Sequence, residues 1–288
     1  MAKKDSISVQ SFVFHKINSA MPCEGLLKDR TPEAWKAPEP RTSFWLLFTA
    51  AQILLLAAVT LVLFWVLKFH KFAWREDPAN EFYAHPVLMI VGLIFFAGEG
   101  MLMYRSLEIC VKHRFYIKLA HTICHFLAIP AIVMGLITVL DSHQLRFPPI
   151  PDFYSLHSWV GLVTISLFAL QVFRSFAVGF TSFIVFLCCD TNTAAFRAAL
   201  VPIHGTMGLV TFLLSIVAAI SGLTEKAIFS LGKDYSTILL RPESRAGIEG
   251  LVMNSLGAVL IALAIVMPFV LRQRRPQYQL VQVVENQN

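Results

Sequence analysis

Two histidines at the start of a long apolar stretch are the first residues that indicate chemistry. His121 and His125 lie one helical turn apart in YIKLAHTICHFLAIPAIVMGLITVL, residues 116–140. The stretch is long and apolar enough to cross a bilayer, whereas ionisable side chains are rare in membrane-spanning helices. Where they do occur, they mark cofactor sites, proton relays or ion paths.

Three more histidines open apolar stretches in the same way as His121. They are His85 in FYAHPVLM, His157 in YSLHSWVG and His204 in VPIHGTMG. Because consecutive spans run antiparallel, alternate helices begin at the same membrane face. The order along the chain therefore predicts His85 and His157 near one face, and His121 and His204 near the other.

A pair of imidazoles at each face suits two haem groups. A neutral imidazole from each of two facing helices is a good axial pair for an iron porphyrin in the core of a helical bundle. Two axial imidazoles leave the iron no open position, which favours electron transfer over oxygen chemistry. The competing use is a histidine-lined transporter for metal ions or protons. Metal transport normally adds carboxylates or thiolates near mid-membrane, and the spans supply mainly Glu99 and Cys124.

Six apolar stretches must position these histidines. The chain has 288 residues, of which 56% are hydrophobic and 15% charged, and its mean hydropathy is +0.64. A soluble protein of this size carries more charge. Each stretch is near or above the ~20 residues that span a bilayer, and together they cover residues 44–67, 86–104, 119–140, 157–187, 201–223 and 250–271. The sequence predicts an all-α polytopic membrane protein with six transmembrane helices.

The distribution of Lys and Arg predicts that both termini are cytoplasmic. Of the 24 basic residues, 16 fall in segments on the side of the termini and 8 on the opposite side, and cytoplasmic loops carry the excess. We divide the chain into a disordered cytoplasmic N-terminal tail (1–43), a six-helix domain (44–271) and a cytoplasmic C-terminal tail (272–288). The basic surface is expected to face anionic lipid or small anions. Nucleic acid is not an expected partner, because no binding motif is present.

Five short motifs resemble the cytochrome b561 family of ascorbate-reducible transmembrane electron carriers. They are HPVLM, MLMYRSLE, SLHSWVGL, PIH and SGLTEKAIF, all within residues 82–235. The resemblance implies six helices, of which the central four form a bundle holding two b-type haems. It implies that His85 and His157 bind the non-cytoplasmic haem, and that His121 and His204 bind the cytoplasmic one. It also implies a homodimer.

The same resemblance implies a substrate site at each face. Arg114, Lys118 and Arg197 correspond to a basic rim that binds ascorbate by charge-assisted hydrogen bonds; ordinary positive-inside charges are the alternative. On the other face, His143 and Tyr154 resemble the non-cytoplasmic substrate site. His143 could bind a ferric chelate or relay a proton, unless it is a plain loop histidine.

Four further residues resemble supporting positions of the family. Arg105, together with Glu99, and Gln171 are expected to hydrogen-bond the haem propionates or neighbouring helices. His125 lies one turn deeper than His121, which suits a hydrogen-bonding neighbour of the haem better than a ligand.

The expected function is that of a transmembrane oxidoreductase. Cytosolic ascorbate would supply single electrons, which two b haems would conduct to a non-cytoplasmic acceptor, with ferric iron as the first choice. Monodehydroascorbate in a secretory vesicle is the alternative acceptor, and a metal or proton transporter is the alternative from another class. The expected location is the plasma membrane, an endolysosome or a secretory vesicle.

Overall fold

The computed structural model describes residues 42–110, 114–186, 192–237 and 242–273, and this part of the chain is helical, without strands. Apart from their innermost two residues, the predicted tails 1–43 and 272–288 lie outside the described residues.

Six helical segments are long and apolar enough to cross a membrane, as the sequence predicts. The second is continuous through four shorter elements, one of them a π-helical segment. In chain order the elements are α2 (Thr42–Phe69), α3 (Pro78–Glu81), α4 (Ala84–Met89), π-helical η1 (Ile90–Phe96), α5 (Ala97–Cys110), α6 (Arg114–Gln144), α7 (Leu156–Phe186), α8 (Asn192–Leu231), the 3₁₀ turn η2 (Gly232–Thr237) and α9 (Arg245–Arg272).

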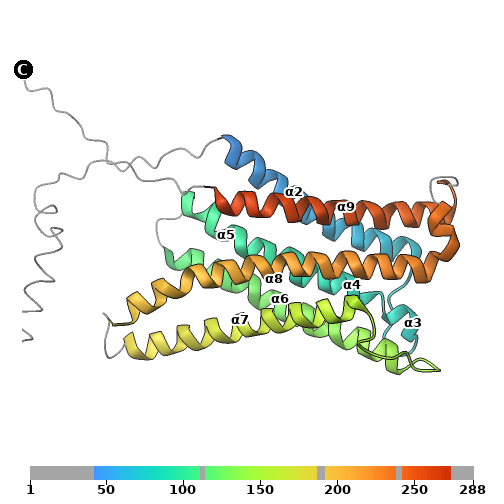
Figure 1. The fold of residues 1–288 in the computed structure, drawn as a ribbon, viewed down its shortest axis with the longest axis horizontal. Coiled ribbons are helices and arrows are strands. Elements are labelled where there is room, and N and C mark those ends of the chain that lie inside the picture. Colours follow the sequence, from blue (N-terminus) through green and yellow to red (C-terminus); the bar gives the residue numbers. More distant parts are fainter. Residues whose placement is uncertain (1–41, 111–113, 187–191, 238–241, 274–288) are drawn as a thin grey trace, which may run out of the picture. The chain divides into compact units, whose positions relative to one another are not determined.

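The helices lie side by side in pairs (Figure 1). α2 packs along α9, α5 along α6, and α7 along α8. We call the end where α6 and α8 begin the His121 end, and the end where α4 and α7 begin the His85 end. These are the left and right ends of the bundle in Figure 1.

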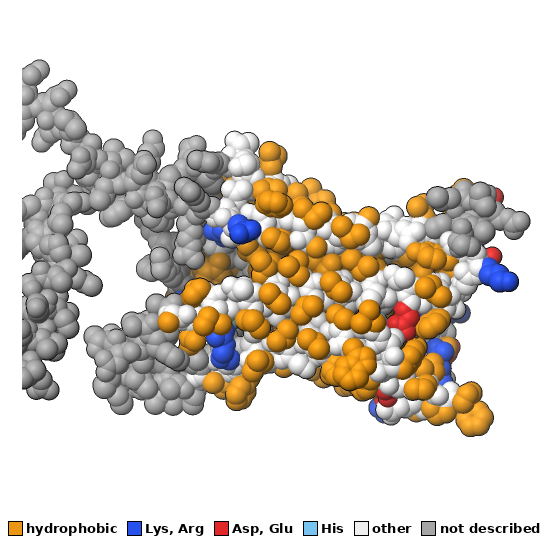
Figure 2. Space-filling model, in the orientation of Figure 1, with side chains coloured by type: hydrophobic (Ala, Val, Ile, Leu, Met, Phe, Trp, Pro, Cys, Tyr) orange, Lys and Arg blue, Asp and Glu red, His pale blue; other side chains and the backbone are white. Residues whose placement is uncertain are grey.

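The main hydrophobic core lies among α2, α4–α5, α8 and α9, and a smaller one joins η1, α6 and α7. The larger core contains fully buried Leu55, Ile94 and Leu260, and the smaller one contains Ala128 and Phe168. On the face drawn in Figure 2, hydrophobic side chains cover the middle of the bundle and basic side chains lie toward its ends. This pattern fits a protein whose outer surface contacts lipid.

Helices α2 and α9 are tied together at the His85 end by one buried carboxylate. Glu249 accepts from Trp65 Nε1 at 3.0 Å and from His70 Nε2 at 2.7 Å. Arg245 also donates to the carbonyl oxygen of Phe69, the last residue of α2, at 2.7 Å. α2 and α9 carry none of the four predicted ligands, and we call them the outer pair of helices. These hydrogen bonds therefore join the outer pair without involving the paired histidines.

Candidate functional site

The structure brings the four histidines together in the predicted pairs, one near each end of the bundle. The ring centroids of His85 and His157 are 6.1 Å apart, with an angle of 86° between the ring planes. Those of His121 and His204 are 6.0 Å apart, at 78°.

Both separations fit a haem iron held between two imidazoles. Two metal–imidazole bonds of about 2 Å each, and about 1 Å from each nitrogen to its ring centre, place the centroids about 6 Å apart. No group of three or more His, Cys, Asp or Glu side chains in the described ranges could hold a bare metal ion. A porphyrin needs only the two axial imidazoles, because it supplies the other four nitrogens itself. The donor set therefore fits haem.

Backbone carbonyl groups orient three of the four imidazoles. His85 Nδ1–H donates to the Gly135 oxygen, His121 Nδ1–H to Gly100 and His157 Nδ1–H to Ala218, each at 2.8 Å. Each bond fixes the tautomer that leaves Nε2 with a free lone pair, which is the state a metal ligand requires. His204 is the exception, since its buried Nδ1 has no hydrogen-bond partner among the described residues.

The acceptors stand fourteen or fifteen residues after the paired histidines of their own helices. Gly135 follows His121 by fourteen residues on α6, and Ala218 follows His204 by fourteen on α8. Gly100 follows His85 by fifteen, and η1 lies between them. A π-helical turn closes its hydrogen bonds over one residue more than an α-helical turn, so η1 accommodates the extra residue. Fourteen residues of α-helix span about 21 Å, which is the axial separation of the two histidine sites.

Two glycines give the imidazoles room. A Cβ atom at Gly222 would lie 2.7 Å from both Cε1 and Nδ1 of His157, and one at Gly100 would lie 2.9 Å from His125 Nε2. Real Cβ contacts are not this short, so even alanine would displace the rings. At these two positions, a histidine ring occupies the space that a side chain would take.

His125 lies beside the His121 site and not across from another histidine. Its ring centroid is 4.5 Å from that of His121 and 5.8 Å from that of Phe168. Tyr104 of α5, which the sequence reasoning missed, also contacts this site. The centroid of its ring lies 5.1 Å from that of His121. These contacts are those of neighbours that enclose a ligand.

At the His85 end, His143 is held by an acid that the sequence reasoning missed. Its Nδ1–H donates to Asp152 Oδ1 at 2.9 Å. Tyr154 is more than half exposed, and its pKa is raised by partial desolvation of the hydroxyl and by the nearby Glu225 carboxylate. A hollow of about 450 Å³, lined by residues that include His157 and Glu225, lies between the start of α7 and the end of α8.

Two cations at the His85 end were also missed. Lys226 Nζ lies 4.5 Å from the ring centres of both Phe82 and Tyr83 and makes no ion pair with a described carboxylate. It follows Gly222 by one turn on α8, on the same face but nearer the end of the bundle. Arg146, in the loop after α6, has a buried Nε that finds no acceptor among the residues the structure describes.

At the His121 end, only part of the predicted basic rim can be described. Lys118 is exposed on α6, three residues before His121. Arg114 and Arg197 belong to α6 and α8, but their side chains lie outside the described residues. Arg174 of α7, which the sequence reasoning missed, interacts electrostatically with His204.

The expected supporting residues contact neighbouring helices. Glu99 accepts from Gln52 of α2 at 3.0 Å. The Arg105 guanidinium donates to the carbonyl oxygens of Leu271 and Gln273, at the C-terminal end of α9. Gln171 Nε2 donates to Thr211 Oγ1 of α8 at 3.1 Å.

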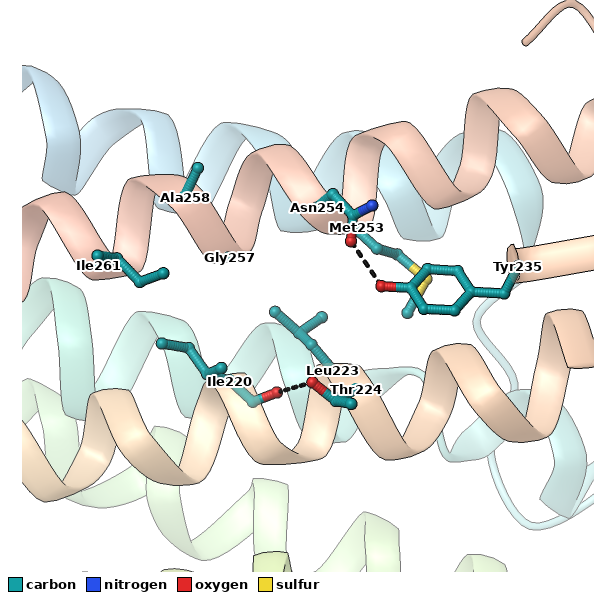
Figure 3. A pocket seen from close by; sticks show the side chains of 9 residues that line it. All are labelled: Ile220, Leu223, Thr224, Tyr235, Met253, Asn254, Gly257, Ala258 and Ile261. Carbon is teal, nitrogen blue, oxygen red and sulfur yellow. Dashed lines mark hydrogen bonds between the residues drawn. The ribbon is translucent and has the colours of Figure 1, made fainter. Parts of the chain in front are cut away.

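A separate cavity of about 250 Å³ lies between α8 and α9 and contains none of the histidines (Figure 3). Its lining is largely apolar. The Thr224 hydroxyl donates back to the Ile220 carbonyl, and the Tyr235 hydroxyl donates to Asn254 Oδ1 at 2.7 Å. With these hydroxyl groups bonded inside the protein, we assign the cavity no chemistry.

The region that holds the four paired histidines also matches a known family. The sequence model of eukaryotic cytochrome b561 matches residues 84–230, which include His85, His121, His157 and His204. The chain belongs to the cytochrome b561 family. The family name implies a b-type haem, and the histidine pairs fit its axial positions.

Several relatives of this cytochrome b561 carry names that state an activity. The chain is 34% identical to the lysosomal membrane ascorbate-dependent ferrireductase of Danio rerio, covering 77% of this chain and 85% of the relative. It is 32% identical to a plasma membrane ascorbate-dependent reductase of Xenopus tropicalis (76% and 71%) and 34% identical to a transmembrane ascorbate-dependent reductase of Ovis aries (69% and 70%). The six spans and these relatives make this a multi-pass membrane protein.

Proposed function

We propose that this protein transfers single electrons across a membrane, from cytosolic ascorbate to ferric iron on the other side. The observation that carries the proposal is the presence of two imidazole pairs, one toward each end of the bundle, each with the ring separation of an axial pair. The names of the relatives support ascorbate as donor and ferric iron as acceptor. A b haem between two imidazoles supplies reversible one-electron chemistry without an open coordination position.

The chain would hold two b haems, and its own residues would orient them. His85 and His157 would hold one, and His121 and His204 the other. The negatively charged propionates are most stable toward the ends of the bundle, away from hydrocarbon. At the His85 end, Lys226 and the buried Nε of Arg146 lack acidic partners among the described residues, which suits them to this charge.

The His121 end would face the cytosol and bind ascorbate. Lys118, with Arg114 and Arg197 at the same end of α6 and α8, would attract the ascorbate monoanion and bind its enediol oxygens by charge-assisted hydrogen bonds. Positive charge at this rim also favours loss of the second enediol proton, which accompanies loss of the electron.

The His85 end would present the electron to the acceptor. Asp152 fixes His143 with Nδ1 protonated, so Nε2 of His143 is available to a ferric chelate. Tyr154 lies near it in sequence, on the connection between α6 and α7 that also carries Asp152. Monodehydroascorbate is the second candidate acceptor. It takes a proton as well as an electron, and a protonated His143 would supply that proton.

The orientation, membrane and assembly follow the same proposal. The excess of basic residues on the side of the termini supports cytoplasmic N- and C-terminal tails. The relatives named for the plasma membrane and the lysosomal membrane support these two locations, beside a secretory vesicle. Family resemblance supports a homodimer.

Proteoliposomes test the function directly. Vesicles that contain purified holoprotein and internal ascorbate should reduce an external ferric chelate, and vesicles without ascorbate should not. Monodehydroascorbate offered in place of the chelate decides between the two acceptors. Folded protein that is colourless, or that reduces neither acceptor, would contradict the proposal.

Ligand variants test the assignment of the two sites. His121→Ala and His85→Ala should each remove about half of the haem, with different changes in the α-band, because they belong to different pairs. His143→Ala serves as the matched control at the His85 end, since it removes an imidazole from the acceptor site and should leave both haems bound.

A further inference from the structure

One histidine ligand lacks the hydrogen bond that orients the other three. His85, His121 and His157 donate to carbonyl oxygens at 2.8 Å, whereas the buried Nδ1 of His204 has no partner within the part of the chain that the structure describes. A buried N–H group without an acceptor is rare and destabilising. We therefore expect an acceptor for the Nδ1–H group of His204 nearby in the folded protein.

The exchange of hydrogen bonds between paired helices indicates where this acceptor should be. His85 donates to Gly135 of α6, and α6 in turn donates through His121 to Gly100. In the other pair, His157 of α7 donates to Ala218 of α8, fourteen residues after His204. The reciprocal position, fourteen residues after His157 on α7, is Gln171.

The side chain of Gln171 has a free acceptor, and its orientation is fixed. Thr211 Oγ1 donates its proton to the Met207 carbonyl at 2.8 Å, so it must accept the bond from Gln171 Nε2. The amide oxygen consequently points away from Thr211. This Oε1 atom is buried and accepts from no donor in the described ranges.

The two unpaired atoms belong to the same region between α7 and α8. Gln171 Oε1 lies 3.9 Å from the position that a Cβ atom of Gly208 would take. Gly208 follows His204 by four residues, one turn along the same face of α8. A buried donor on His204 and a buried acceptor on Gln171 thus border the same stretch of α8, and an ordered water molecule can join two such groups that do not meet directly.

We propose that Gln171 is the positioning residue of His204, accepting from its Nδ1–H through one ordered water in place of the backbone carbonyl used at the other three ligands. The inference rests on the proposed function, since it concerns the haem that His121 and His204 would hold. An acceptor on Nδ1–H makes Nε2 a stronger electron donor, which favours ferric over ferrous iron. Gln171 therefore lowers the reduction potential of that haem.

Redox titration of purified holoprotein with Gln171→Met tests this role, because methionine keeps the length of the side chain and removes the amide. The haem of the His121 end should become easier to reduce by about tenfold, which is about 59 mV for one electron. The haem of the His85 end should keep its potential. Thr211→Val, which releases the Gln171 amide without contacting His204, should shift the same haem in the same direction by less.

The sign of the shift separates this role from a merely structural one. Looser packing that admits water would favour the more positively charged ferric form and lower the potential, whereas loss of the hydrogen bond raises it. Asn254→Leu, which removes a side-chain amide from α9, is the control and should shift neither potential.

Each outcome of the redox titration either supports or contradicts the role of Gln171. A fall in the potential, no change, or a shift at the His85 end would overturn the role of Gln171. If Gln171→Met does not fold, Thr211→Val decides by the same criterion. Wild-type protein without haem would instead contradict the proposed function, so the two failures are distinguishable.

Discussion

At the scale of single residues, the histidine sites are built with neutral groups. The acceptors for His85, His121 and His157 are backbone carbonyls and not carboxylates. A carboxylate in this position would bring a charge into the membrane interior, where charged groups are costly. A carbonyl fixes the tautomer without that charge.

Gly222→Ala should disturb the His157 site. The added methyl group would lie 2.7 Å from the His157 ring, so the imidazole must shift from its present position opposite His85. We expect loss of about half of the bound haem, measured by its absorbance per protein. Gly257→Ala is the matched control, because a Cβ atom there meets nothing within 4 Å. Equal haem content in the two variants would contradict the role assigned to Gly222.

Lys226→Gln should make the haem of the His85 end harder to reduce. A nearby positive charge favours the form with one more electron, so its removal should lower the potential, by up to about 59 mV, a tenfold change in the reduced-to-oxidised ratio. Redox titration measures this shift. Lys71→Gln, which removes an exposed lysine from the same end, should leave the potential unchanged; an equal shift in both variants would mean that only surface charge is involved.

At the scale of helices, the ligand-bearing helices and the outer pair have separate tasks. η1 adjusts the second span so that His85 and Gly100 both meet α6, although fifteen residues separate them. Helices α2 and α9 contribute no ligand, and pack against α4–α5 and α8 through the main hydrophobic core.

Glu249→Gln should weaken the attachment of α2 to α9 and leave haem binding intact. Hydrogen bonds to a charged group contribute about 1.5–3 kcal/mol each, and Glu249 accepts two of them, from Trp65 and His70. We expect a loss of about 2 kcal/mol in the free energy of unfolding, seen as a lower melting temperature in detergent. Glu243→Gln changes an exposed acid at the same end and should melt like the wild type. A Glu249→Gln protein that also melts like the wild type would exclude this role.

At the scale of the whole molecule, the two ends differ in the charges near their histidines. The His121 end has Lys118 and Arg174 near the paired histidines. The His85 end combines Lys226 and Arg146 with the acids Asp152 and Glu225 in the surrounding loops and helix ends. An anionic reductant should therefore bind preferentially at the His121 end.

Lys118→Gln should raise the KM for ascorbate. Loss of one charge-assisted hydrogen bond of about 1.4 kcal/mol corresponds to about a tenfold increase, and the effect should diminish at high salt. The rate of haem reduction by ascorbate in proteoliposomes measures it. Lys71→Gln is the control at the opposite end; if both variants raise the KM equally, the rim does not bind ascorbate.

The sequence was sufficient to predict the six spans and the pairing of the four histidines, because apolar length and antiparallel order determine both. It did not reveal the acceptors at Gly100, Gly135 and Ala218, since every residue has a carbonyl and only tertiary packing decides which one meets an imidazole. Asp152 was missed because it lies in ordinary loop sequence. Lys226 lies within the motif SGLTEKAIF, but the motif alone gives its lysine no role. A spacing of fourteen residues from a ligand to a small residue is a signal that could have found Gly135 and Ala218.

The exchange of hydrogen bonds between α4–α5 and α6 has a kinetic consequence. Since each of these segments carries a ligand for one site and an acceptor for the other, sliding one along its neighbour would break both bonds together. The distance an electron must cross is therefore set by helical rise and not by bilayer thickness. The same protein should conduct at the same rate in thin and in thick membranes.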